Sequence, residues 1–300
     1  MEGQTNIIRL SNGFHVWTRK VGESPIKVLL LHGGPGLTHD YLENFQEYLS
    51  PEGIEIYFYE QLGSFYSDQP DQNELWNLEC FCDEVEEVRL GLGLSDFYLY
   101  GHGWGGMLAI EYALKYGDSL KGLIISSITA STKSFVKSGN ESRDALPAEV
   151  VEKMKSLEES GGSEGQEYEN LYWEYYGKKH ICRLDSKPEP VARTEKRINL
   201  NVLEPLMGDK EFDVNGALKD WDRWENLNDI TSPSLVIAGR HDALYEEDIE
   251  EMGRRLPNSR VAYCEEGSLL AMWDDPNAYF KHILSFLQDV EDGKIESQKK

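Results

Sequence analysis

The segment from Phe97 to Ile110 constrains the fold more than any other part of this 300-residue chain. An apolar, aromatic run meets a glycine cluster, Gly101-His102-Gly103-Trp104-Gly105-Gly106, and a helix-compatible run follows. This pattern predicts a strand, a sharp turn and a helix, which is the setting of the nucleophile elbow, Gly-x-Ser-x-Gly. The frame glycines Gly101 and Gly105 are present, but the central residue is Gly103, which offers no nucleophile.

Strands and helices are predicted to alternate on both sides of this segment. The strands are expected at residues 27–31, 54–59, 120–126, 234–238 and 260–264, and the helices at 38–49, 78–92, 246–256 and 276–288. Two further strands, 7–10 and 14–18, flank Asn12-Gly13, a strong hairpin signal. Such alternation predicts an α/β fold with a mostly parallel sheet and helices on both faces. We expect Glu84, Glu86 and Glu87 on the solvent side of the helix 78–92.

The stretch 130–226 differs from the rest because it is charged, helical in pattern and crowded with aromatic residues, with a flexible loop predicted at Ser160–Gly165. We therefore predict a core domain of residues 1–129 and 227–290, a helical cap of 130–226 and a frayed tail of 291–300. Sites on parallel sheets lie at the carboxyl ends of the strands. The cap is expected to cover that end.

The charge of the chain excludes some partners. It has 54 acidic against 30 basic residues and a net charge of −24, so it repels nucleic-acid phosphates and anionic lipids. We expect no nucleic-acid and no membrane partner. The charge serves solubility or, alternatively, attracts cationic substrates such as peptide N-termini.

The N-terminus and the cysteines indicate a cytoplasmic protein, which we expect to be a monomer. Met1-Glu2-Gly3-Gln4 lacks the apolar core of a secretory signal. The four cysteines are read as reduced thiols. Cys80-Phe81-Cys82 is too tight for a metal site, and no metal or cofactor is predicted.

Five motifs occur in order along nearly the whole chain. They are His32-Gly33-Gly34-Pro35-Gly36, Gln61-Leu62-Gly63-Ser64 with Ser67-Asp68-Gln69-Pro70, Gly101-His102-x-Trp104-Gly105-Gly106, Gly239-Arg240-His241-Asp242, and Gly267-Ser268-Leu269-Leu270-Ala271-Met272-Trp273-Asp274-Asp275. The set resembles the proline iminopeptidase (prolyl aminopeptidase) family of α/β hydrolases. The resemblance implies the α/β-hydrolase fold, no cofactor, and cleavage of an N-terminal proline or other small residue from short peptides by a Ser-Asp-His triad.

The resemblance also shows what is missing from the triad. Its serine falls on Gly103, its aspartate on Asp242 and its histidine on Leu269. Because the histidine takes the serine proton and the aspartate orients the histidine, Asp242 alone has no such role. Removing triad members costs about 10⁶-fold in rate, so we expect no efficient peptidase. The implied oxyanion hole, the backbone N–H groups of Gly34 and Trp104, survives side-chain loss.

Further candidate site residues come from the same resemblance. The family's cap glutamates hold the substrate amine, and Glu174 and Glu204 are the candidates here, unless they are ordinary exposed helix carboxylates. Leu203 and Met207, together with Leu206, are expected to make the site more apolar.

A first hypothesis is a repurposed catalyst. The family has Asp-Gln-Leu-Gly where this chain has Glu60-Gln61-Leu62-Gly63, and a carboxylate in an apolar site is a stronger base. Glu60 would abstract a proton from a small aromatic substrate stacked on Phe65 and Trp104, as in a Kemp-type elimination. The alternative is that Glu60 only caps buried backbone N–H groups. Loss of nucleophile and base together, with the other motifs intact, favours an engineered scaffold.

Two other hypotheses remain open. The chain is a prolyl-peptide binder that cannot cleave its ligand, either a natural pseudoenzyme or an inactivated aminopeptidase. Otherwise it is a hydrolase with another nucleophile among Cys80, Cys82 and Cys264, assisted by His32 or His102. His241, which precedes Asp242, is expected to pack in the fold or to face water.

Overall fold

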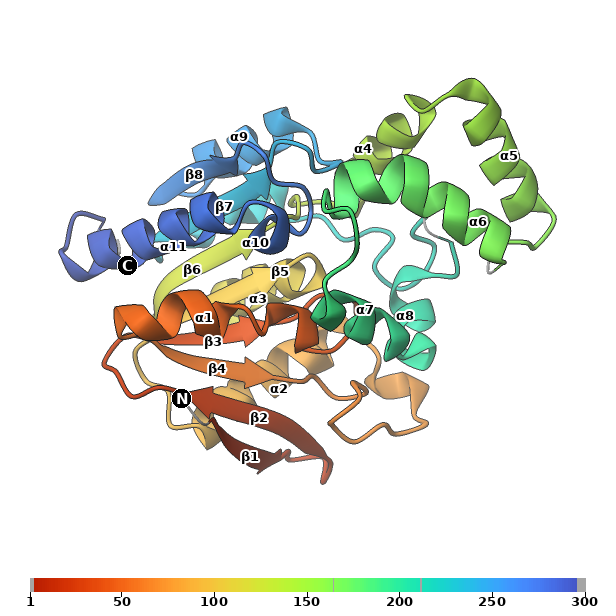
Figure 1. Cartoon of the computed structure of the whole chain (residues 1–300). Coiled ribbons are helices and arrows are strands. Elements are labelled where there is room, and N and C mark those ends of the chain that lie inside the picture. Colours follow the sequence, from red (N-terminus) through yellow and green to blue (C-terminus); the bar gives the residue numbers. More distant parts are fainter. Residues whose placement is uncertain (1–2, 164, 211, 296–300) are drawn as a thin grey trace.

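An eight-stranded sheet in the order β1-β2-β4-β3-β5-β6-β7-β8 forms the centre of the computed structural model, which describes residues 3–163, 165–210 and 212–295 (Figure 1). The strands β1 (Gln4–Arg9) and β2 (His15–Val21) form the predicted antiparallel hairpin. The other strands run parallel to one another: β3 (Lys27–Leu31), β4 (Glu55–Tyr59), β5 (Phe97–His102), β6 (Leu120–Ser126), β7 (Ser234–Gly239) and β8 (Ser259–Cys264).

Helices cover both faces of the sheet, which confirms the predicted fold class. One layer contains α1 (Phe45–Leu49) and α11 (Pro276–Glu291), and the other α2 (Leu78–Gly91), α3 (Trp104–Tyr116) and α9 (Glu246–Arg255). Short helical turns complete the core: η1 (Asp40–Leu42), η2 (Ser50–Glu52), η3 (Asn73–Leu75), η4 (Gly117–Ser119), η6 (Trp224–Asp229) and α10 (Ala271–Asp274). Strands buried on both faces explain the continuous apolar runs in the sequence.

The predicted helix 38–49 is instead a turn of 3-10 helix followed by the short α1. Its first residues are held by other segments. Thr38 hydrogen-bonds Thr194, and both the backbone N–H and the ring of His39 hydrogen-bond Glu60. These contacts replace the regular helical bonding that the sequence pattern favoured.

The prediction that Glu84 faces solvent is wrong. The side chain is buried with Phe81, Val85 and Val88 on the face of α2 that packs against the sheet. Its carboxyl accepts hydrogen bonds from the Tyr59 hydroxyl and from the backbone N–H of Leu62. Burial raises the pKa of Glu84 to about 7. Because these two partners satisfy the carboxyl, it fits a position that periodicity alone assigns to an apolar residue.

Helical segments inserted between β6 and β7 lie beyond the carboxyl ends of the parallel strands (Figure 1). They are α4 (Thr132–Asp144), α5 (Ala148–Glu159), α6 (Gln166–Leu171), the π-helix η5 (Tyr172–Ile181), α7 (Glu189–Lys196) and α8 (Leu200–Met207). Leu146, Val150, Met154 and Tyr168 belong to a small separate core. The boundaries 130 and 226 stay predictions, and residues 296–300 of the predicted tail lie outside the described residues.

None of the helices in the described ranges has both the length and the apolar character that crossing a bilayer requires.

Candidate active site

The turn after β5 keeps the geometry of a nucleophile elbow without its nucleophile. Gly103 has φ +54° and ψ −119°, and α3 begins at the next residue. A Cβ atom at Gly101 would overlap the Gly105 carbonyl, and one at Gly105 would overlap the backbone of Leu31. Glycine is therefore required at both frame positions. At Gly103, by contrast, a Cβ atom would meet nothing within 4 Å, so the space for a side chain is open.

Two unpaired backbone donors lie in the turns that follow β5 and β3. Neither the N–H of Trp104 nor that of Gly34 has a hydrogen-bond partner within the described chain. A Cβ at Gly34, which has φ +122°, would lie 2.7 Å from the N atoms of Gly36 and Leu37. Only glycine therefore fits this loop. Unpaired N–H groups at a strand–helix turn can bind the oxygen of a carbonyl or carboxylate.

A hydrogen-bond chain joins the loops that follow β3, β5 and β8. The backbone N–H of Gly33 donates to the Tyr41 hydroxyl, 2.7 Å away. The Tyr41 hydroxyl donates to Nδ1 of His102 at 3.1 Å, and Nε2 of His102 donates to the Leu269 carbonyl at 2.9 Å. Burial lowers the pKa of His102 to about 4. The imidazole is therefore neutral, and it fixes the relative position of the loops.

The loop after β4 is fixed in the same way. His32, whose pKa burial lowers to about 4, accepts from the backbone N–H of Gln61. The Gln61 side chain donates to the His32 carbonyl and accepts from the indole of Trp104 at 2.7 Å. The Trp104 ring is buried and packs edge-on against Phe81. The expectation that this ring forms a wall for a flat ligand is therefore wrong, because the ring is part of the core.

Asp242 lies at the carboxyl end of β7 with one oxygen unsatisfied. Its Oδ2 is buried and has no hydrogen-bond partner. Burial raises the pKa of Asp242 to about 7, against hydrogen bonds from Ser127 and from the backbone of Ala243 and Leu244. Ser127 is a non-glycine residue with φ +53°. Its hydroxyl also lies 3.3 Å from the Leu269 carbonyl, so the one side chain contacts both Asp242 and the Leu269 loop.

The loop that carries Leu269 is bound to the cap. Its N–H donates to the carbonyl of His180 on η5 at 3.0 Å. Nδ1 of His180 donates to the carbonyl of His241, and Nε2 of the same ring is buried without a partner. Sequence reasoning did not identify Ser127, Tyr41 or His180 as site residues, because their roles depend on contacts between distant segments.

Glu60 is enclosed on all sides, with an exposed fraction of 0%. One carboxylate oxygen accepts from the ring and backbone N–H of His39, at 2.7 and 3.2 Å. The other accepts from the backbone N–H of Tyr66 at 2.7 Å. Glu60 thus caps buried N–H groups, the alternative that the sequence left open.

Comparison with known proteins assigns this site to a family. Residues 27–274 match the family model of the alpha/beta hydrolase fold. A proline iminopeptidase of Flavobacterium johnsoniae is 39% identical over 286 residues, covering 94% of this chain and 96% of the relative. One of Elizabethkingia meningoseptica is 40% identical over 283 residues, covering 93% and 95%. The chain belongs to the proline iminopeptidase family.

Solved structures agree with this assignment. The crystal structure of VinJ has a TM-score of 0.90 at 28% identity and covers 96% of this chain and 99% of its own. The proline iminopeptidase of Mycobacterium smegmatis has a TM-score of 0.89 at 25% identity, covering 97% and 100%. The proline iminopeptidase scaffold is thus present over nearly the whole chain.

Three further candidates from the sequence, Phe65, Glu174 and Glu204, have exposed side chains. Phe65 is 47% exposed and lies under the guanidinium of Arg197. Glu174 is exposed and forms an ion pair with Lys178 at 2.6 Å, and Glu204 is exposed. The ion pair and the exposure fit the reading of these glutamates as ordinary helix carboxylates. Their role as amine ligands stays a proposal.

Apolar residues of α8 occupy different depths. Leu206 is fully buried in the core, Met207 packs partly buried against the same core, and Leu203 is partly buried. They make the core side of the cap apolar.

The cysteines considered as alternative nucleophiles lie in different surroundings. Cys264 is fully buried at the end of β8, and burial raises the pKa of its thiol. Cys80 is exposed, but it lies in the first turn of α2. His32 and His102 have both ring nitrogens in hydrogen bonds. Among the described residues that this hypothesis names, Cys264, His32 and His102 are therefore enclosed or already hydrogen-bonded.

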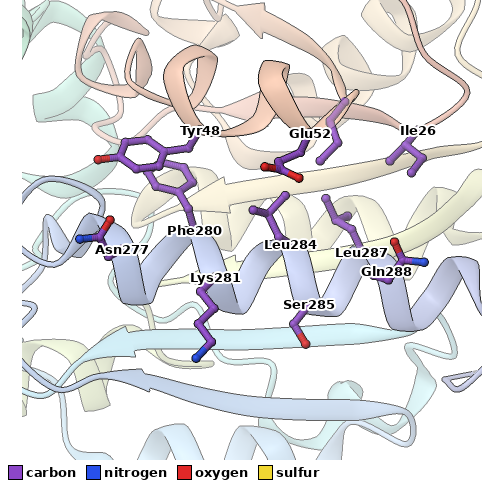
Figure 2. Close-up of a pocket in the computed structure, with 11 residues that line it drawn as sticks. Ile26, Tyr48, Glu52, Asn277, Phe280, Lys281, Leu284, Ser285, Leu287 and Gln288 are labelled. Carbon is purple, nitrogen blue, oxygen red and sulfur yellow. The ribbon is translucent and has the colours of Figure 1, made fainter.

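A cavity of about 490 Å³ lies away from the elbow, between α1 and α11 (Figure 2). Ile26 and Ile54, which precede β3 and β4, line it, so it opens near the amino ends of these strands. Tyr48 stacks on Phe280 at its side, with ring centroids 4.2 Å apart. This cavity is therefore near the amino ends of the parallel strands, whereas Gly103 follows the carboxyl end of β5.

His39, Asp40 and Glu43 place possible metal ligands within 4.8 Å of one another. Each already has a partner. His39 bonds Glu60, Asp40 pairs with Arg193 and Arg197, and Glu43 pairs with Arg193. Two arginines occupy the position where a cation would have to bind, so we assign no metal to this group.

Proposed function

We propose that this chain binds short peptides that begin with proline or another small residue, and does not cleave them. The observation that carries the proposal is that the elbow combines unpaired backbone donors with an open space. The N–H groups of Gly34 and Trp104 are unpaired, and the space above Gly103 is open where the family's serine hydroxyl would stand. The donors that hold a carbonyl oxygen remain, while the atom that would attack the carbonyl carbon is gone.

The second triad loss supports the same function. A hydrolase of this family needs an imidazole between its hydroxyl and Asp242, and Leu269 offers only hydrocarbon there. The neutral His102 has both ring nitrogens in structural hydrogen bonds. A bound peptide would therefore meet neither a nucleophile nor a base, and it would leave the site intact.

The charge of the chain favours a ligand with a free amine. A net charge of −24 raises the local concentration of cations around the molecule. A peptide carries a positive N-terminus and a carbonyl oxygen, which suit the acidic surface and the two backbone donors. A peptide with a blocked amine offers only the second feature and should bind more weakly.

Calorimetry with prolyl-alanine and with N-acetylated prolyl-alanine tests this proposal, and mass spectrometry checks that the peptide stays intact. Gly103→Asp should abolish binding, because its carboxylate competes for the unpaired donors. Gly93→Asp is the matched control, since Gly93 also has positive φ and open space around its Cβ position. Binding that survives Gly103→Asp, absence of binding, or cleavage by the wild-type chain would each contradict the proposal.

Glu60 as a general base is a second proposal. The observation that favours it is the full burial of the Glu60 side chain. The hydrogen bonds from His39 and Tyr66 to both of its oxygens speak against it. Turnover of 5-nitrobenzisoxazole between about pH 5 and 9, compared with Glu60→Gln, decides the matter. A rate that rises with pH and vanishes in the variant supports the base, and equal rates reject it.

A further inference from the structure

The strand β1 leaves one edge of the sheet open. It stands at the end of the strand order and forms the lower margin of the molecule in Figure 1. Along its six residues it pairs with β2 alone, in one continuous register without a bulge. Proteins usually protect an exposed edge strand with proline, bulges or several charged side chains. Of these features β1 has only one charge, Arg9 at its end, so its outer edge is suited to pair with another strand.

The residue pairs between β1 and β2 show which way the backbone groups of β1 point. Ile7 stands opposite Trp17. The N–H of Trp17 donates to Oγ of Ser67 at 2.9 Å, and its carbonyl accepts from the backbone N–H of Glu60 at 2.9 Å. Both backbone groups of Trp17 therefore turn away from β1. In an antiparallel ladder this makes Ile7 and Trp17 a non-hydrogen-bonded pair, so the N–H and the carbonyl of Ile7 point outward.

The positions on either side of Ile7 point outward as well. Arg9 stands opposite His15, whose N–H donates to the Asp68 carboxylate at 2.8 Å and whose carbonyl accepts from the Asp68 N–H at 2.9 Å. Thr5 follows from the two-residue period of a strand. The N–H and carbonyl groups of Thr5, Ile7 and Arg9 thus line the free edge, and none of them has a hydrogen-bond partner among the described residues. All three residues are exposed.

The strand at the other edge of the sheet, β8, is partly covered by side chains of α11. Nε2 of His282 donates to the Tyr263 carbonyl at 3.2 Å. The guanidinium of Arg260 pairs with the carboxylate of Asp289 at 2.5 Å. Within the described ranges no helix contributes such a side chain to the outer edge of β1. The two edges therefore differ, and only that of β1 offers a row of free backbone groups.

An apolar side chain stands at the centre of this open edge. Ile7 is 56% exposed, and among the large apolar side chains of the described chain only Leu90 is more exposed. Ile7 lies on the same face of the strand as Thr5 and Arg9, midway between them. An exposed isoleucine keeps apolar surface in water, and a strand added beside it would bury part of that surface.

We propose that two copies of this chain pair through their β1 strands, antiparallel and about a two-fold axis at Ile7, so that one sheet continues through both copies. Ile7 then stands opposite the same residue of the partner, and Thr5 stands opposite Arg9. This register joins every outward N–H to an outward carbonyl. A second copy suits the edge because its free groups are symmetric about Ile7. The dimer departs from the monomer expected from the sequence, and it is independent of what binds above Gly103.

The charges of the strand fit this register. Because Arg9 stands opposite Thr5, no like charges face each other directly. The two copies of Arg9 lie about 14 Å apart along the strands, which exceeds the screening length of about 8 Å at physiological salt. The net charge of −24 on each copy opposes association at longer range. Added salt should therefore strengthen the dimer, whereas it weakens an interface made by opposite charges.

Sedimentation equilibrium of the whole chain, from micromolar to millimolar concentration, tests the proposal. We expect a monomer–dimer equilibrium that shifts toward the dimer as sodium chloride is raised. A chain that stays monomeric at millimolar concentration and high salt would overturn the proposal. A dimer that dissociates as salt is raised would also overturn it, because opposite charges elsewhere on the surface would then hold the copies together.

Matched variants locate the interface. Ile7→Lys places two ammonium groups opposite each other at the axis and should weaken dimerisation by about tenfold. Leu200→Lys makes the same change at a side chain of the cap helix α8 that is 48% exposed, and it should leave dimerisation unchanged. Both side chains are exposed, so both variants should fold, which circular dichroism checks. Equal dimerisation constants of the two variants would overturn the assignment of the interface to β1.

A cysteine at the axis tests the register. The Cα atoms of a hydrogen-bonded antiparallel pair lie about 5.5 Å apart, which a disulfide can bridge. The background is Cys80→Ser, because Cys80 is the exposed native thiol. Oxidised glutathione should convert Ile7→Cys into a covalent dimer, visible on a non-reducing gel. Thr5→Cys is the matched control, since its partner across the strands is Arg9, and it should stay uncrosslinked. Crosslinking of both variants to the same extent, or of neither, would overturn the two-fold axis at Ile7.

Discussion

The loops at Gly103 and Leu269, which the resemblance aligns with the serine and the histidine of the family's triad, have different structures. At Gly103 the elbow backbone persists and the volume of the missing side chain is open. At Leu269 a hydrocarbon side chain takes the place of the imidazole, and three hydrogen bonds, to His180, His102 and Ser127, hold the loop. One position is vacant and the other is filled.

The difference matters most for Asp242, because the histidine that would hydrogen-bond its carboxyl in the family's triad is aligned with Leu269 by the resemblance. The elbow donors need no side chain and keep their function when the serine is lost. The Oδ2 of Asp242 is buried without a hydrogen-bond partner. The open space at Gly103 therefore leaves no polar group unsatisfied there, whereas the surroundings of Leu269 include an unsatisfied acid with a raised pKa.

Restoring both side chains gives the largest expected effect. Gly103→Ser with Leu269→His should recover hydrolysis of prolyl p-nitroanilide, because serine enters open space and histidine regains Asp242 as its partner. Triad members act as a unit, so the double variant should exceed either single variant by at least about 10³-fold. Initial rates of nitroaniline release measure this. A folded double variant as slow as the single variants would show that the two loops no longer meet in catalytic geometry.

Alanine at two elbow glycines tests how rigid the vacant frame is. Gly101→Ala should destabilise the fold by several kcal/mol or prevent folding, because its Cβ would overlap the Gly105 carbonyl of α3. Gly103→Ala should fold, since nothing lies within 4 Å of its Cβ position. Urea unfolding of both variants measures the difference. Similar stabilities of the two variants would mean that the elbow backbone relaxes around an added Cβ atom. The frame glycines, Gly101 and Gly105, would then not explain the open space at Gly103.

Asp242 should make stability depend on pH. The folded chain holds the carboxyl proton up to about pH 7, whereas the unfolded chain releases it near the ordinary value of 3.8. Folding is therefore favoured at low pH, and stability falls as pH rises between these values. Asp242→Asn cannot ionise, so it should gain about 2–4 kcal/mol over wild type at pH 8, at about 1.4 kcal/mol per pKa unit.

Urea unfolding at pH 5 and pH 8 compares the two chains. Glu84, whose pKa is also raised to about 7, contributes the same slope to both and cancels in the difference. If the free energy of unfolding depended on pH equally in wild type and in Asp242→Asn, the Asp242 carboxyl would have a hydrogen-bond partner in solution that offsets its burial.

The sequence predicted the fold well because its signals are local. Glycine spacing marked the elbow, Asn12-Gly13 marked the hairpin, and continuous apolar runs marked the buried strands, for which Lys27–Leu31 has the predicted bounds. Each signal depends on neighbouring residues and on a fixed backbone period. The assignment of Gly103 and Leu269 to two triad positions stays a prediction of the resemblance.

The orientation of side chains was harder to predict. The carboxylates of Glu60 and Glu84 face inward because His39, Tyr66, Tyr59 and Leu62 offer hydrogen bonds there. Most of these partners are many residues away in the chain, and no local pattern reveals them. The same holds for the contact of His180 with the Leu269 loop, which joins cap and core across 89 residues of sequence. Contacts of this kind decide which polar residues face a site.

The smallest expected effect concerns the serine alone. Gly103→Ser should lower the free energy of unfolding by about 1 kcal/mol, because a non-glycine residue at φ +54° is strained although its side chain is unobstructed. Gly93→Ser, at φ +68° and in equally open space, should cost a similar amount. Thermal unfolding of the two variants measures both costs. Gly93→Ser is the control for Gly103→Ser, because both changes act only through backbone conformation. A much larger cost at Gly103 would show that the elbow loop has closed around the vacant position, and it would remove the distinction between the two lost side chains.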